Sequence, residues 1–142
     1  MAILYNSVDT KFPKIKRREI SKWIKNVAST YSKRVGEISY IFCSDEEILR
    51  INRQYLNHDY YTDIITFDYS EGDIISGDLF ISLDTVKSNS ENYLVDYQQE
   101  MYRVIIHGIL HLCGLKDKTP EDEKKMRDNE DKALSLLKVD TE

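Results

Sequence analysis

Two histidines four residues apart, His107 and His111, constrain this chain more than any other feature. In an α-helix, four residues return a side chain to within about 40° of its starting direction, so both imidazoles can face one metal ion. Gly114 follows, and its tolerance of positive φ lets the chain reverse and return Asp117 to the same ion. The spacing H-x3-H-x2-G-x2-D therefore predicts a metal helix that ends at a glycine turn.

The same geometry occurs in the zincin pattern HExxHxxGxxH, where a glycine turn returns a third ligand. This chain departs twice, because Gly108 replaces the general-base Glu of a protease and Asp117 replaces the third His. Hydrolysis would then rely on water activated by zinc, which lowers its pKa to about 7, or on a base from elsewhere. We therefore predict one zinc ion per chain on His107, His111 and Asp117 and disfavour a standard peptidase. His58 is an alternative ligand if its loop folds over the helix, and a satisfied core pair of histidines is the plain alternative.

Hydrophobic periodicity predicts one α+β domain over residues 1–142, a length typical of a single domain. We expect a small mixed β-sheet with packed helices and the metal helix beside it. Strands are expected over 2–8, 37–43, 63–69 and 77–82, with the last two antiparallel, and helices over 14–34, 44–56, 84–93, 96–112 and 119–137.

Capping residues mark the expected helix ends. Ser44, Asp84, Asp96 and Thr119 each precede a helical pattern and have side chains suited to an N-cap. Gly36 is expected to end the first helix.

Charge is unevenly distributed along the sequence. The net charge of −5, from 20 basic and 25 acidic side chains, excludes a uniformly basic RNA-binding protein. Residues 11–34, however, hold nine basic side chains against one acidic, among them Lys14, Lys16, Arg17 and Arg18. This segment predicts a local surface able to follow a phosphate backbone, and the alternative is a solvated helix face.

No feature of the sequence indicates a membrane protein. The longest apolar run, residues 104–112, is interrupted by both histidines and is far shorter than the roughly 20 residues of a membrane span. The N-terminus lacks a basic stretch and a small-residue cleavage site, and Cys43 and Cys113 form no CxxC pair. We expect a cytoplasmic protein without a membrane partner.

Three segments resemble the YbeY family of metal-dependent endoribonucleases, also called ribosomal RNA maturation factors. Residues 107–117, HGILHLCGLKD, match the family's HGxLHLxGxxH at every position except the last histidine. Residues 51–55 and 61–67 resemble its LNxxYR and PTDVLSF segments, and residues 76–81 resemble its GDI strand. The resemblance covers residues 36–134.

This resemblance implies a zincin-like fold and a single-strand-specific, zinc-dependent endoribonuclease. The implied role is 3′-end maturation of small-subunit (16S) ribosomal RNA and ribosome quality control, with single-stranded RNA and ribosomal particles as partners. It places Asp63 and Thr66 near the metal, where they could orient water or substrate. The family's arginine falls on Leu56 here, so its contact with a phosphate passes to another group such as Arg53 or is absent.

Two other functions remain open from the sequence. Leu56 and Asp117 favour an assembly factor that holds metal structurally and binds ribosomal particles without cutting RNA. A zincin-like hydrolase of another substrate has the ligands but lacks the glutamate base at position 108.

Overall fold

The computed structural model describes residues 2–57 and 62–137, which form one four-stranded sheet and five helices. The strands lie in the order β1-β2-β4-β3, with β1, β2 and β4 parallel and β3 antiparallel to β4. The mixed sheet, the α+β class and the antiparallel pairing of the last two strands are therefore confirmed. The elements are β1 (Ala2–Ser7), α1 (Arg17–Thr30), β2 (Arg34–Cys43), α2 (Asp45–Tyr55), β3 (Ile64–Asp68), β4 (Ile74–Ser82), α3 (Leu83–Tyr93), α4 (Tyr97–Leu112) and α5 (Pro120–Ser135).

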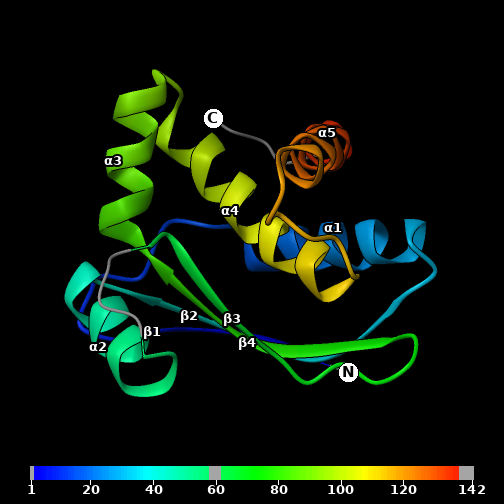
Figure 1. Cartoon of the computed structure of the whole chain (residues 1–142), viewed down its shortest axis with the longest axis horizontal. Helices are drawn as coiled ribbons and strands as arrows, with labels where there is room; N and C mark the ends of the chain where they lie inside the picture. Colours follow the sequence, from blue (N-terminus) through cyan, green and yellow to red (C-terminus); the bar gives the residue numbers. More distant parts are fainter. Residues whose placement is uncertain (1, 58–61, 138–142) are drawn as a thin grey trace.

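Helices cover the two faces of the sheet unequally (Figure 1). Helices α1 and α4 pack on one face with α5 above them, whereas α2 lies on the other face. In the larger core, Tyr40 and Leu79 of the sheet are fully buried with Ile105 and Ile109 of α4. Burying each such side chain contributes about 1.5–3 kcal/mol, so this face fixes α4 against the sheet. In the described part of the chain, no helix has the length and apolar character needed to cross a membrane.

Three of the four predicted caps are confirmed. Ser44, Asp96 and Thr119 each accept a hydrogen bond from a backbone N–H three residues further on, at 3.3, 3.3 and 3.0 Å. The prediction for Asp84 was wrong, because Ser82 caps α3. Asp84 instead accepts a hydrogen bond from the backbone N–H of Asp45 at the start of α2 (3.0 Å), so it ties two helices together.

Gly36 has a different place from the one expected. Helix α1 ends at Thr30, and Gly36 lies within β2 at a register shift between Val35 and Ile38. A Cβ at this position would come within 2.4 Å of the Ser76 hydroxyl oxygen on the neighbouring strand. The glycine therefore permits the close approach of β4, and it does not end a helix.

Candidate metal centre

Helix α4 ends in the predicted glycine turn. Gly114 has φ of +106° and donates its N–H to the carbonyl of His111 (2.9 Å), while Leu115 donates to Leu110 (3.0 Å). These two hydrogen bonds form a Schellman motif, which reverses the chain after the helix. The reversal carries Asp117 back beside the two histidines.

The three predicted ligands converge on one point. The Oδ2 atom of Asp117 lies 3.3 Å from Nε2 of His111 and 3.5 Å from Nε2 of His107. One ligand atom from each of these residues lies within 4.8 Å of the other two. Donors held at about 2.0–2.2 Å by one tetrahedral zinc ion would be roughly 3.4 Å apart, so the donor set fits a single cation.

A buried carboxylate on α5 orients His107. Glu130 is 5 % exposed, and its Oε2 lies 2.6 Å from Nδ1 of His107. Because a carboxylate only accepts, this contact places the proton on Nδ1 and leaves Nε2 free to bind metal. The other oxygen of Glu130 pairs with Arg103 (3.0 Å), which also binds Asp131 (2.9 Å).

The same carboxylate sets the charge preference of His107. Burial lowers the pKa of this imidazole, but the hydrogen bond and negative charge of Glu130, with Asp63 and Asp117, outweigh burial and raise the pKa above its ordinary value. The pocket therefore stabilises positive charge at this position, whether a proton or a metal ion supplies it.

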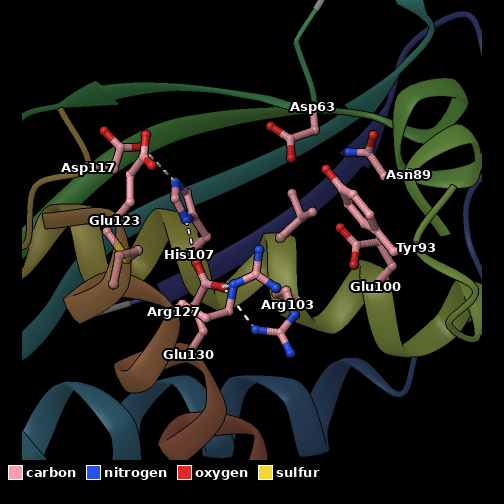
Figure 2. Close-up of a pocket in the computed structure, with 12 residues that line it drawn as sticks. Asp63, Asn89, Tyr93, Glu100, Arg103, His107, Asp117, Glu123, Arg127 and Glu130 are labelled. Carbon is pink, nitrogen blue, oxygen red and sulfur yellow. Dashed lines mark hydrogen bonds and ion pairs between the residues drawn. The ribbon is translucent and has the colours of Figure 1, made fainter. Parts of the chain in front are cut away.

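Two cavities meet at His107, Asp117 and Asp63. The larger, about 530 Å³, runs between α2, β3 and the metal ligands and is also lined by Thr66 and Leu56. The smaller, about 240 Å³, extends the other way along α4 (Figure 2). The predicted site residues Asp63 and Thr66 thus share the larger cavity with the ligands.

Asp63 occupies the junction of the two cavities because its backbone is fixed next to β4. Its carbonyl accepts a hydrogen bond from the backbone N–H of Ser82 (2.9 Å), which holds the residue just before β3. Burial raises the pKa of its carboxyl group, and the nearby His107 acts in the opposite direction. Figure 2 shows the carboxylate directed toward α4 from the opposite side of the cavity.

Other predicted binding residues lie outside these cavities. Lys14, Lys16, Arg17 and Arg18 are exposed and line neither cavity, and Gln98 at the start of α4 donates to the carbonyl of Lys14 (2.7 Å). They are therefore near the end of α4 that is remote from the ligands. Arg53 is exposed on α2 and also lines neither cavity, whereas Leu56 lines the larger one. His58, the alternative ligand, lies outside the described residues.

Close packing against the sheet explains why position 108, between the two histidines, is a glycine and not the glutamate base of a protease. A Cβ there would approach within 2.2 Å of Leu79 and 2.9 Å of Ile64, both on the sheet. A glutamate at this position would therefore be directed into the sheet and not into the larger cavity beside the ligands. The packing of α4 on the sheet therefore leaves no room for a general base at this position.

Comparison with known sequences identifies the family. The family described as "Endoribonuclease YbeY" matches residues 5–138. The endoribonuclease YbeY of Parabacteroides distasonis is 62% identical over 137 residues, covering 96% of both chains. That of Bacteroides thetaiotaomicron is 61% identical over 136 residues, covering 96% of this chain and 99% of the relative. The chain belongs to the endoribonuclease YbeY family.

A solved structure supports the same fold. The solution structure of TM1509 from Thermotoga maritima matches with a TM-score of 0.67 and 22% identity. The match covers 96% of this chain and 89% of the other. At this level of identity the likeness concerns the fold alone, and it extends over almost the whole YbeY-family domain.

Sequence reasoning missed the carboxylates that surround the YbeY-family motif. Glu130 and Glu100 are both 5 % exposed, yet neither was singled out. A signal exists for Glu130, because it occupies the apolar stripe of α5 between Met126 and Ala133, both buried. A carboxylate in such a stripe indicates a buried partner, here His107 and Arg103.

Proposed function

We propose that this chain is a zinc-dependent endoribonuclease that cuts single-stranded RNA and acts in 3′-end maturation of 16S ribosomal RNA and in ribosome quality control. Membership of the endoribonuclease YbeY family supports RNA cleavage. The donor set of two imidazoles and one carboxylate supports zinc. Ribosomal particles as partners and a cytoplasmic location belong to the same proposal.

One observation supports a catalytic and not a structural metal site: the three ligands line the larger cavity, which we call the groove. Structural zinc sites are typically closed by four protein ligands, whereas catalytic sites keep a position for water or substrate. Within the described residues, three ligands converge at a cavity of about 530 Å³. A phosphodiester group can therefore reach the position that the protein leaves open.

His107, His111 and Asp117 would hold the zinc ion, which supplies a Lewis acid for the scissile phosphate when bound. Glu130 holds His107 in the tautomer that this role requires. Asp63 faces the ligands across the groove, and its carboxylate accepts a hydrogen bond from the attacking hydroxyl group and so orients it. Thr66, which also lines this cavity, donates a hydrogen bond from its hydroxyl group to a phosphate oxygen.

The basic residues extend the proposed RNA path. Lys14, Lys16, Arg17 and Arg18 are exposed before and at the start of α1, at the end of α4 that is remote from the ligands. Their charge is concentrated although the whole chain is acidic. RNA bound through this segment would be held at one end of α4 and cut at the other, and Arg53 adds a further exposed cation on α2.

Metal analysis combined with cleavage of a single-stranded RNA tests this proposal. We expect about one zinc per chain in the wild type, loss of metal and cleavage in His111→Ala, and weaker metal binding in Asp117→Ala. Glu121→Gln, an exposed substitution in the first turn of α5, is the matched control and should behave as wild type.

Each contrary outcome identifies a different error. Metal retention by His111→Ala would contradict the site, and cleavage that survives loss of the metal would place catalysis elsewhere. A wild-type protein that binds zinc and RNA without cutting would favour the assembly factor, which Leu56 in the groove also suggests. Cleavage of a peptide substrate that a chelator blocks would favour the zincin-like hydrolase.

A further inference from the structure

The smaller cavity beside the metal ligands is also lined by polar side chains that do not belong to the metal site. It measures about 240 Å³ and is lined by side chains of α3, α4 and α5 (Figure 2). Asn89 and Tyr93 of α3 line one side, Glu100 and Arg103 of α4 line another, and Asp63 lies across from them. Side chains with hydrogen-bond acceptors, hydrogen-bond donors and an aromatic ring thus surround one space next to the catalytic groove.

Glu100 is the least expected residue in this cavity. The residue is 5 % exposed, and within residues 2–57 and 62–137 its carboxylate forms neither a hydrogen bond nor an ion pair. No fully enclosed polar side-chain atom in this part of the chain lacks a partner, so the carboxylate oxygens must reach the cavity. Because the carboxylate opens only onto this cavity, a ligand carrying N–H donors would find its oxygens unused by the protein.

Neighbouring side chains also favour a polar ligand in this cavity. The amide of half-buried Asn89 also has no hydrogen-bond partner in the described residues. Burial, opposed by Arg103 and reinforced by Asp63, raises the pKa of the Glu100 carboxyl group. Tyr93 is 59% exposed and offers its ring at the cavity edge.

We propose that this cavity is a nucleobase subsite selective for guanine. The Watson–Crick edge of guanine presents N1–H and the N2 amino group side by side, a donor pair that one carboxylate can accept as it accepts the fork of an arginine. Glu100 accepts this pair, the Asn89 amide or Arg103 donates to O6, and the ring of Tyr93 stacks on the base.

Other ligands fit these groups less well. Adenine and cytosine place a ring-nitrogen acceptor beside their amino group, and uracil flanks its N–H with two carbonyl oxygens, so each would bring an acceptor against Glu100. Four of the five carboxylates in the lining, among them Asp63 and Glu100, would repel a phosphate, and Arg103 is already paired with Glu130 and Asp131. A second metal ion is disfavoured because the described residues contain one grouping of three close ligands, and it is the His107 site.

The position of the cavity suits a base of the RNA being cut. Glu100 and His107 are seven residues apart on one helix face, a rise of about 10 Å along α4. This spacing accommodates the base of a nucleotide next to the scissile phosphate while that phosphate lies at the metal ligands. The inference therefore rests on the proposed RNA cleavage and adds a sequence preference to it.

Two matched RNAs test the subsite without relying on cleavage. Both are single-stranded oligoadenosine chains with 2′-O-methyl groups, and they differ only at the central nucleotide. That nucleotide is guanosine in one RNA and inosine, which lacks the N2 amino group, in the other. Fluorescence anisotropy with the zinc-loaded wild type should show roughly tenfold tighter binding of the guanosine RNA, the effect of losing one hydrogen bond to a charged group. In Glu100→Gln this ratio should fall to about one.

Glu91→Gln, an exposed carboxylate of α3 outside both cavities, should keep the wild-type ratio. Equal binding of the two RNAs by the wild type would overturn the subsite, and so would an unchanged ratio in Glu100→Gln. Cleavage of the corresponding unmodified RNAs reports separately on the proposed function. Cutting without a guanosine preference contradicts the subsite alone, whereas tighter guanosine binding without cutting contradicts the nuclease assignment alone.

Discussion

The two ends of the polar face of α4 differ in whether the protein itself supplies partners for the polar side chains. At the C-terminal end, His107 is bonded on one side to Glu130 and faces Asp117 on the other, and Glu130 is itself paired with Arg103. Two turns earlier, Glu100 is equally buried but has no hydrogen bond or ion pair with the described residues. One end thus has its polar groups satisfied within the protein, and the other does not.

This contrast separates two kinds of site. A metal centre gains from ligands held in place by further contacts, since these contacts fix the orientation and protonation of the donor atoms. A subsite for a polar ligand must keep acceptors and donors unused until the ligand supplies their partners. This difference is consistent with the two proposals, in which the metal end of α4 acts on the RNA backbone and the Glu100 end binds a base.

Glu130→Gln should produce the largest effect, and it acts on the metal end. Glutamine keeps the shape but removes the negative charge that raises the pKa of His107 and supports its binding to a cation. We expect zinc affinity, measured by competition with a chelator, to fall roughly 10–100-fold. The guanosine preference of RNA binding should remain, because Glu100 is untouched.

Asp131→Asn is the control for Glu130→Gln. Asp131 also pairs with Arg103 (2.9 Å), but its side chain is 57% exposed and it has no contact with His107 in the structure. Its zinc affinity should equal that of the wild type. Equal losses in the two variants would show that Arg103, and not the orientation of His107, controls metal binding.

Gly108→Ala should have the next largest effect, because it acts on the contact between α4 and the sheet. The added methyl group would overlap the buried side chain of Leu79 and crowd Ile64. We expect the free energy of unfolding, from denaturant titration, to fall by about 1–3 kcal/mol. Since Gly108 lies between the two histidines, zinc affinity should also fall, while the remote Glu100 end keeps its preference.

Leu79→Val in the Gly108→Ala background tests the cause. Valine lacks the methyl group that the new Cβ would meet, so the double variant should lose less stability than the sum of the two single losses. Simple additivity would show that the helix had already shifted away from the sheet and that Gly108 serves another purpose.

These contrasts also show what sequence can predict at the site. The pair His107 and His111 with Gly114 is local, so helical spacing and one glycine place Asp117 correctly. The contact of Glu130 with His107 depends on how α5 packs across α4, which no local spacing specifies. Glu100 was missed because the cavity that it lines is formed by α3, α4 and α5 together, and their packing is equally non-local.

The prediction of the fold shows the same difference between features set by local sequence and features set by tertiary packing. Helices and strands with clear periodicity were predicted within a few residues, and three side-chain caps formed as expected. The errors came from residues with tertiary roles. Gly36 is predicted to end a helix but permits the close approach of β4. Asp84 is predicted to cap its own helix but accepts a hydrogen bond from the first residue of α2.

The smallest expected effect concerns the stability of the unsatisfied end. The folded protein raises the pKa of Glu100 mainly by burial, so ionising this carboxyl group opposes folding. Its favourable contribution is complete below the ordinary pKa of 4.5 and is lost as the pH rises through the raised value. Because glutamine does not titrate, Glu100→Gln should match the wild type in acid and become the more stable protein toward neutral pH.

Thermal unfolding of the metal-free proteins between about pH 4 and about pH 7 measures this difference. Glu130→Gln should show the opposite sign at neutral pH, since it removes the carboxylate that pairs with half-buried Arg103 and His107. If Glu100→Gln were instead less stable than the wild type at neutral pH, the ionised carboxylate would have a favourable partner inside the protein. Arg103 is the first candidate for that partner, because its charge lowers the pKa of Glu100. The polar side chains at both ends of α4 would then have partners within the protein, and no base would be needed.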